Sequence, residues 1–171
     1  KENGDIYIGA GTVFSHITAD PIIQECVPVL GEAVDQVGGP QIRNIGTIGG
    51  NICNGAVSAD SVPTVFSYNA LLKIANAGGG RTVPVREFYL GPGRVDLHPG
   101  EVLTHVIIPR AEYEGYHGHY IKYSMRNAMD IATLSCSVVS RIDSAKNILE
   151  DVRITFGVAA PVPYRCMKAE E

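Results

Sequence analysis

The chain has 171 residues, a formal net charge of −4, 45% hydrophobic residues and 19% charged residues. This length predicts one domain or two small ones, at ~100–200 residues per domain, with enough apolar residues for a core. The acidic balance disfavours a nucleic-acid-binding protein, which needs a basic surface. No run approaches the ~18 apolar residues of a transmembrane helix, so no membrane partner is expected. No basic segment followed by an apolar run indicates a secretory signal.

The ends of the chain and its cysteines predict a fragment of a cytoplasmic protein. The sequence begins at Lys1 rather than Met and reaches Glu171 without a closing element, so we interpret it as a piece of a longer chain. No two cysteines form a C-x-x-C pair, which disfavours a local zinc ribbon or iron–sulfur cluster. Reduced thiols are preferred over two disulfides in a chain of this size. The four cysteines are Cys26, Cys53, Cys136 and Cys166.

The chain up to residue 95 predicts short elements separated by glycine, proline and asparagine. Segment 41–60 shows no amphipathic period, so we expect an ordered loop there. Elsewhere apolar residues recur at helical or strand spacing between turn residues. The predicted elements are a strand at 6–11, helices at 12–18 and 29–37, a helix at 61–68 that begins at an Asp60 or Ser61 cap, and a hairpin of strands 71–75 and 81–85.

The chain after residue 95 is richer in Val, Ile, Thr and Ser. Turn residues separate the apolar segments, a pattern typical of an antiparallel meander. A boundary is expected within the glycine- and proline-rich run 91–100, which would divide the chain into domains 1–95 and 96–171. The fold class is therefore α+β. The predicted strands are 102–108, 120–125, 131–142 and 149–158.

The most informative segment is residues 41–54, QIRNIGTIGGNICN. Its length without a period indicates function or disorder, and its regularly placed isoleucines disfavour disorder. Its glycines allow a ligand to approach the backbone, where exposed N–H groups can bind a pyrophosphate. Thr47, Asn51 and Asn54 add groups that can hydrogen-bond phosphate or ribityl oxygens. A glycine-rich corner that only turns the chain is the alternative.

Other common site motifs are weak or missing in the sequence. Residues 9–14, GAGTVF, lack the third glycine of a Rossmann fingerprint, and no G-x-x-x-x-G-K run occurs. His117 and His119 share one strand face, but two histidines are too few for a metal site, and we prefer a polar surface there. Six tyrosines are interpreted as core or interface residues. These are Tyr68, Tyr89, Tyr113, Tyr116, Tyr120 and Tyr123.

Five motifs occur in order along the chain. They are IGAGT at 8–12, IRNIGTIGGN at 42–51 followed by ADS at 59–61, GPG at 91–93, KYSMRNAMDI at 122–131 and FGVAAP at 156–161. Together they resemble the flavin subunit of molybdenum hydroxylases and, within that family, the FAD-binding subunit of bacterial xanthine dehydrogenases. The resemblance implies the second lobe of a vanillyl-alcohol-oxidase/PCMH-type FAD-binding domain in 1–95. An antiparallel-sheet α+β domain of the CO dehydrogenase flavoprotein C-terminal type would follow in 96–171. It also implies that the start of the FAD subdomain and the C-terminal end lie outside this sequence.

The resemblance also implies cofactor-binding residues, with no catalytic residue and no metal ligand in this chain. Asp60 would bind a ribityl or ribose hydroxyl, although by itself it reads as a helix cap. Leu103 would contact the flavin from a strand. Lys122 would lie near the isoalloxazine, where a cation stabilises reduced flavin, although a lysine at a strand start is usually solvated. The residues placed along the FAD phosphates and ribityl chain are Thr47, Ile48, Gly49, Gly50 and Asn51.

The activity implied by the resemblance is that of an FAD-carrying electron-transfer subunit of a molybdenum-dependent hydroxylase, with xanthine dehydrogenase preferred. Substrate oxidation would occur on a molybdopterin-binding subunit, and electrons would pass through an iron–sulfur subunit to FAD, which reduces NAD⁺. The alternatives are flavin subunits of nicotinate, aldehyde or carbon monoxide dehydrogenases, because the substrate never contacts this subunit. A cofactor-less binding or scaffold module is the alternative from another class.

Overall fold

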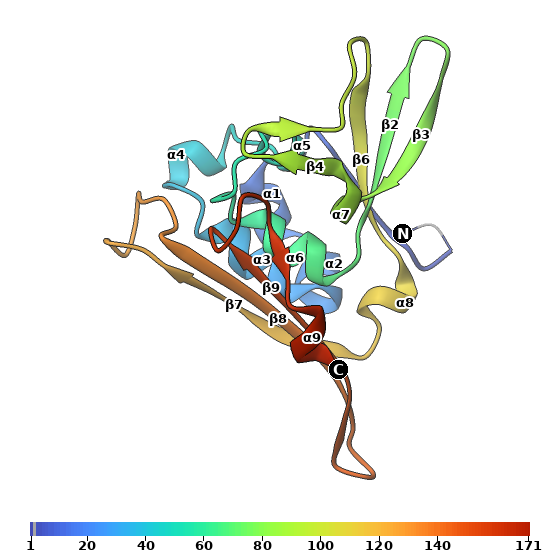
Figure 1. The fold of residues 1–171 in the computed structure, drawn as a ribbon, viewed down its shortest axis with the longest axis vertical. Coiled ribbons are helices and arrows are strands. Elements are labelled where there is room, and N and C mark those ends of the chain that lie inside the picture. Colours follow the sequence, from blue (N-terminus) through green and yellow to red (C-terminus); the bar gives the residue numbers. More distant parts are fainter. Residues whose placement is uncertain (2) are drawn as a thin grey trace.

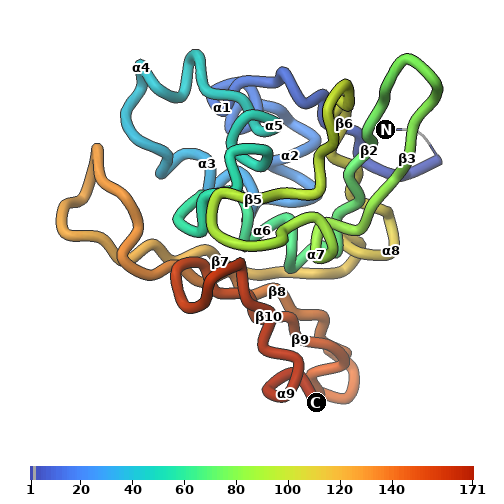
Figure 2. The backbone as a smooth tube through the Cα atoms, turned by 45° about the horizontal axis from the view of Figure 1, so that its top comes forward, coloured from blue at the N-terminus to red at the C-terminus, as the bar shows by residue number. Residues whose placement is uncertain are grey.

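The computed structural model describes Lys1 and residues 3–171. Two four-stranded antiparallel sheets lie on either side of a group of short helices, as Figures 1 and 2 show from two angles. The elements up to residue 95 are β1 (Ile6–Gly9), α1 (Phe14–Ala19), α2 (Pro21–Cys26), α3 (Pro28–Asp35), α4 (Pro40–Arg43), α5 (Ile48–Cys53), α6 (Ser61–Ser67), β2 (Leu71–Asn76), β3 (Gly79–Pro84), α7 (Val85–Phe88), β4 (Tyr89–Gly91) and β5 (Arg94–Val95).

The elements after residue 95 are mainly strands, as the sequence predicts. They are β6 (Val102–Ile108), α8 (Arg110–Tyr113), β7 (Tyr116–Tyr123), β8 (Leu134–Asp143), β9 (Ile148–Gly157), β10 (Tyr164–Arg165) and α9 (Met167–Glu170). None of the helices in the described part of the chain has the length and hydrophobicity needed to cross a membrane.

The first sheet has the strand order β1-β6-β2-β3. β6 lies in its middle, where Ile108 is opposite Ile6 and Val106 is opposite Leu72. The prediction that 102–108 opens the meander is therefore wrong, although its bounds as a strand are right. The residue pattern of a strand indicates a buried face but does not specify which strand it pairs with. The division into domains 1–95 and 96–171 stays a prediction.

The second sheet has the order β10-β9-β8-β7, which confirms a meander of β7, β8 and β9. Its inner face packs on α3 and α6. Residues alternate between the faces of a strand, so every second residue of β7 turns inward, including the buried Tyr116 and Tyr120. Tyr123, predicted as a core or interface residue, lies on the outer face and is exposed.

The expected loop at 41–60 is wrong because the segment contains α5 and most of α4. Thr47 caps α5 with its hydroxyl, which accepts a hydrogen bond from the Gly50 N–H at 3.1 Å. Ile48 and Ile52 are one helical turn apart and fully buried, so α5 is held by its apolar side. The helical spacing of these isoleucines is hard to recognise in the sequence, because the glycines between them add no apolar side chain to the pattern.

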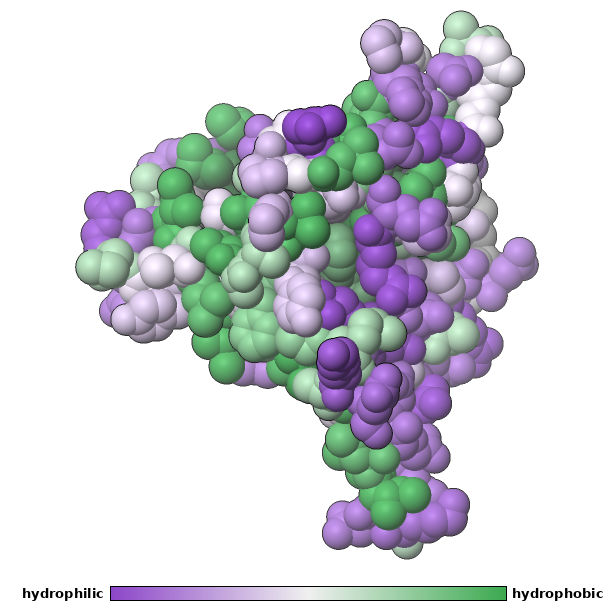
Figure 3. All heavy atoms as spheres, in the orientation of Figure 1, coloured by the Kyte–Doolittle hydropathy of each residue, from purple (hydrophilic) through white to green (hydrophobic). Residues whose placement is uncertain are grey.

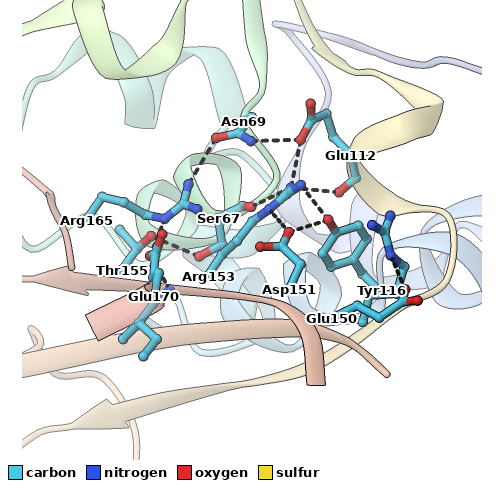
Figure 4. Close-up of polar contacts among 12 residues, drawn as sticks. Ser67, Asn69, Glu112, Tyr116, Glu150, Asp151, Arg153, Thr155, Arg165 and Glu170 are labelled. Atoms are coloured by element: carbon cyan, nitrogen blue, oxygen red, sulfur yellow. Dashed lines mark hydrogen bonds and ion pairs between the residues drawn. The ribbon is translucent and has the colours of Figure 1, made fainter. Parts of the chain in front are cut away.

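A polar network joins α6 and α8 to the second sheet, and Figure 4 shows its residues. Arg153 on β9 is buried and forms ion pairs with Glu112 at 2.7 Å and Asp151 at 3.0 Å. It also donates to the Ser67 carbonyl at 3.2 Å and to the Tyr116 hydroxyl at 2.6 Å. A buried guanidinium needs such partners, since an unpaired charge inside a protein is strongly unfavourable.

We expect Arg153→Ala to lower the free energy of unfolding by ~3–5 kcal/mol, because it leaves two carboxylates without their cation. Arg110→Ala is the control, since the pair of Arg110 with Glu114 is solvent-exposed and such pairs contribute at most ~1 kcal/mol. Urea unfolding of both variants measures the difference. Equal losses in the two variants would show that the network adds nothing beyond a surface ion pair.

Candidate functional site

The glycine-rich motif forms the first turn of α5. Besides the bond from the Gly50 N–H to the Thr47 hydroxyl, the Asn51 N–H donates to the Thr47 carbonyl at 3.0 Å. The Ile48 N–H donates to the Thr12 carbonyl at 3.1 Å. The N–H groups predicted to be exposed for a pyrophosphate are thus paired within the chain at these positions.

Gly49 is packed against the turn that follows β1. Its N–H donates to the Ala10 carbonyl at 2.9 Å. A Cβ atom at Gly49 would lie 2.5 Å from the Ala10 Cβ and 2.7 Å from the Ala10 carbonyl oxygen. Gly49 therefore has a structural reason to be glycine. Cofactor contact by residues 47–51 stays a prediction, and Asn51 is the member that faces a cavity.

That cavity has a volume of about 300 Å³ and lies between the end of α3, the loop before α6 and the loop after β7. Asn51, Asn54 and Asp60 supply its polar groups, and Val37 and Met129 are among its apolar ones. The Asn51 side-chain oxygen accepts a hydrogen bond from the Ser61 hydroxyl at 2.7 Å, which fixes the amide. The predicted residues Asn51 and Asp60 are thus brought to one wall.

A second cavity of about 490 Å³ adjoins the first, since Met129 and Asp130 line both. Lys122 and Arg126 line this second cavity and make it the more basic of the two. The Asp130 carboxylate accepts hydrogen bonds from the main-chain N–H groups of Arg126 at 2.9 Å and Ile131 at 3.0 Å. Asp60 lines the first cavity and Lys122 lines the second, so the contact between these two side chains lies where the cavities adjoin.

Asp60 and Lys122 form a buried ion pair. The distance from Lys122 Nζ to Asp60 Oδ2 is 2.9 Å, and the two side chains are only 6% and 7% exposed. Lys122 Nζ also donates to the Gln36 carbonyl at 2.9 Å, and the Tyr120 hydroxyl donates to Asp60 Oδ1 at 2.7 Å. Asp60 makes no side-chain cap for α6, so the predicted cap is wrong. The interpretation of Lys122 as a solvated lysine is also wrong, since its side chain is buried.

Burial raises the pKa of the Asp60 carboxyl, because desolvation disfavours its charged form. The hydrogen bonds from Lys122 and Tyr120 act in the opposite direction and lower that pKa. The charged form of this carboxyl is thus stabilised by its two partners on β7 rather than by solvent.

Leu103 is not brought to these cavities. It is buried on β6 opposite Ile74, within the core of the first sheet. Neither Leu103 nor any residue of 47–50 lines either cavity. The contact of Leu103 with flavin stays a prediction.

Sequence reasoning missed Tyr120 as part of this site and placed it with the core tyrosines. The signal was its position two residues before Lys122 on a strand, which puts the phenol and the amine on one face. Met129 and Ile131 were also missed as surface residues beside the first cavity, where they are 54% and 72% exposed. Figure 3 shows hydrophobic side chains on the left of the view, the side of α4 and the β7–β8 loop.

His117 and His119 lie on the outer face of β7 and are exposed. His119 Nδ1 is 2.9 Å from a carboxylate oxygen of Glu32. Within Lys1 and residues 3–171, no three His, Cys, Asp or Glu side chains are grouped as metal ligands.

Two known domain families match the chain. The FAD-binding domain in molybdopterin dehydrogenase matches residues 1–111. The chain belongs to this family. The CO dehydrogenase flavoprotein C-terminal domain matches residues 119–171. The predicted family, the α+β fold class and FAD as the cofactor are thereby confirmed.

Relatives of this family resemble nearly the whole chain. The xanthine dehydrogenase FAD-binding subunit of Escherichia coli O157:H7 is 43% identical over 99% of this chain and 58% of its own length. The nicotinate dehydrogenase FAD-subunit of Eubacterium barkeri is 33% identical, with coverages of 99% and 58%. CO dehydrogenase of Oligotropha carboxidovorans superposes with a TM-score of 0.92 at 27% identity, over 99% of this chain and 58% of that one. The chain thus spans less than two thirds of these relatives.

We expect Gly49→Ala to lower the free energy of unfolding by ~1–3 kcal/mol, because its methyl group would overpack the contact with Ala10. Gly11→Ala is the matched control, since a Cβ at Gly11, in the neighbouring turn, meets nothing within 4 Å. Thermal or urea unfolding of the cofactor-free protein measures both. A Gly49→Ala protein as stable as Gly11→Ala would contradict the structural role of this glycine.

Proposed function

We propose that this chain is the FAD-carrying electron-transfer part of a molybdenum-dependent hydroxylase, with xanthine dehydrogenase preferred. The observation that carries the proposal is that Asn51, Asp60 and Lys122, from two motifs far apart in the sequence, meet at two adjoining cavities. The 43% identity to a xanthine dehydrogenase FAD-binding subunit supports the preference for that enzyme.

The residues at the cavities fit the parts of an FAD molecule. The side chains of Asn51 and Asn54 offer amide donors and acceptors for hydroxyl or phosphate oxygens, and Arg126 offers a cation for an anionic group. Val37 and Met129 provide apolar surface of the kind that a flavin ring contacts. The same wall therefore combines polar and apolar groups.

When bound, FAD supplies the exchange of electrons and hydride, and the protein positions and tunes it. Asp60 would accept a hydrogen bond from a ribityl or ribose hydroxyl, since each carboxylate oxygen has a lone pair left beyond its present bond. Lys122 would place its ammonium group, paired with the Asp60 carboxylate, near the ring. Residues 47–51 would lie along the phosphates and ribityl chain, and Leu103 would contact the flavin from β6.

The partners in this proposal are an iron–sulfur subunit, which delivers electrons, and a molybdopterin-binding subunit, which oxidises the substrate. NAD⁺ would take the electrons, and the complex would act in purine metabolism in the cytoplasm. The names of related proteins support a multi-subunit complex, since the relative from Hydrogenophaga pseudoflava is a carbon monoxide dehydrogenase medium chain.

The main alternative is the same electron-transfer role in an enzyme for nicotinate, an aldehyde or carbon monoxide. It is favoured by relatives named for nicotinate, glyceraldehyde and carbon monoxide dehydrogenases, at 31–34% identity. Turnover of the purified complex with xanthine, nicotinate, glyceraldehyde and CO, each with NAD⁺ or a dye as acceptor, separates these choices. A protein that stays colourless after incubation with FAD would instead favour the cofactor-less scaffold.

We expect Gly50→Val to abolish flavin binding while the second sheet stays folded. A Cβ at Gly50 would lie 2.9 Å from the Thr47 hydroxyl, so the added side chain displaces this hydroxyl at the start of α5, and no residue of the second sheet is among its neighbours. Absorbance of flavin retained after desalting measures binding, and far-UV circular dichroism monitors folding. Gly11→Val, in the neighbouring turn, serves as the control. If Gly50→Val retains flavin with unchanged affinity, the first turn of α5 is only a structural corner.

A further inference from the structure

Strand β7 carries two tyrosines, Tyr116 and Tyr120, and each donates a hydrogen bond to a carboxylate in a different part of the protein. Both are buried on its inner face, four residues apart, and each donates its hydroxyl to a carboxylate that is paired with a cation. The two sets are Tyr116–Asp151–Arg153 and Tyr120–Asp60–Lys122. Only the second set lies at the cavities of the candidate site.

The Tyr120 phenol is fixed in place before any ligand arrives. Its side chain is 1% exposed, and its main-chain N–H donates to the Glu32 carboxylate at 3.1 Å. Its hydroxyl holds Asp60 Oδ1 at 2.7 Å while Lys122 Nζ holds Oδ2 at 2.9 Å. Both oxygens of the Asp60 carboxylate thus accept a hydrogen bond, and rotating the carboxylate would break at least one of these two buried hydrogen bonds.

We propose that Tyr120 is a positioning residue of the flavin site, whose hydroxyl holds the Asp60 carboxylate so that Lys122 stays at the junction of the two cavities with its charge neutralised. This inference rests on the proposed function of the chain as an FAD carrier. Tyr120 itself lines neither cavity and acts through Asp60.

The consequence of losing the hydroxyl follows from the burial of Asp60. Burial already raises the pKa of this carboxyl, and the hydrogen bond from Tyr120 opposes that rise. Without the bond the pKa rises further, so Asp60 takes up a proton at a higher pH. A protonated Asp60 no longer neutralises Lys122, and the site becomes more positive below that pH.

The neighbouring titratable groups are unchanged by this substitution. They are Glu32 on α3, Cys136 on β8 and Asp130 in the loop after β7, and none of them bonds to the Asp60 carboxylate. A pH effect of Tyr120→Phe is therefore assigned to the Asp60–Lys122 pair.

The test uses Tyr120→Phe in the full protein loaded with FAD, with Tyr116→Phe as the matched control. The measurement is the flavin midpoint potential from pH 4 to pH 9. We expect the pH at which Asp60 alters the potential to rise by about one pH unit or more in Tyr120→Phe, the size expected for a lost hydrogen bond to a charged group. Tyr116→Phe should leave the profile unchanged. Lys122→Met should lower the potential, and in that background Tyr120→Phe should have little further effect.

A second measurement needs no flavin. An acid whose pKa is raised in the folded state contributes stability that is fully present at a pH below its pKa in the unfolded state. This stability is lost as the pH rises through its pKa in the folded state. Tyr120→Phe should thus lose more thermal stability at pH 7 than at pH 4. The pKa of Asp151 is lowered, so its carboxyl stays ionised across this range and the loss in Tyr116→Phe should vary little.

The outcomes separate the two proposals. A shift in both the potential and the stability profile supports the role of Tyr120. A stability profile like that of Tyr116→Phe, or a stability shift without any change in potential, overturns it. Failure of the unaltered protein to bind FAD overturns the proposed function and this inference with it, while the stability profile still shows whether Tyr120 holds Asp60.

Discussion

Every residue of α6 is buried, and this burial governs how the two sheets are joined. Because this seven-residue helix is covered on all sides, water does not reach the backbone N–H and C=O groups at its ends. Their hydrogen-bond partners must therefore come from the surrounding elements. At its C-terminal end the Ser67 hydroxyl donates to the Thr155 hydroxyl at 2.9 Å, and Arg153 donates to the Ser67 carbonyl. The second sheet supplies both partners.

The N-terminal end of α6 is also joined to the second sheet, here through the side chain of the residue that precedes the helix. Asp60 directly precedes the helix, and Lys122 and Tyr120 of β7 hold its two carboxylate oxygens. Each end of α6 is therefore tied to the second sheet through a cation of that sheet, Lys122 at one end and Arg153 at the other. The candidate site is formed at the first of these contacts, between Asp60 and Lys122, so its geometry depends on how the second sheet packs against α6.

The sequence predicts those parts of the fold that depend on neighbouring residues. The bounds of β6 and the β2–β3 hairpin follow from alternation and turn chemistry, and β8 and β9 lie within a few residues of their predicted bounds. The pairing of β6 with β1 was not predicted, because residue pattern does not encode which strand will lie alongside. Helix α5 was missed because glycines interrupt its apolar side, although its buried isoleucines are one turn apart.

The site shows the same division between local and tertiary information. The ADS motif identified Asp60 as a candidate site residue. Its position just before a helix also predicted a helix cap, which is the usual role of an aspartate there. The ion pair with Lys122 depends on a strand more than sixty residues along the chain, so only the docked sheet reveals it. Strand alternation places Tyr120 on the same face as Lys122, but only the docked sheet shows that its hydroxyl meets Asp60.

The site is also divided between the two domain families that the chain combines. Asn51 and Asp60 lie within the FAD-binding family match at 1–111, whereas Tyr120 and Lys122 lie within the C-terminal match at 119–171. An isolated first domain would leave Asp60 without its cation, and an isolated second domain would leave Lys122 without its carboxylate. Because neither charge is well tolerated alone in a buried position, the pair links formation of the site to association of the domains. The same ion pair that joins the start of α6 to β7 thus makes the candidate cofactor site a property of both domains together.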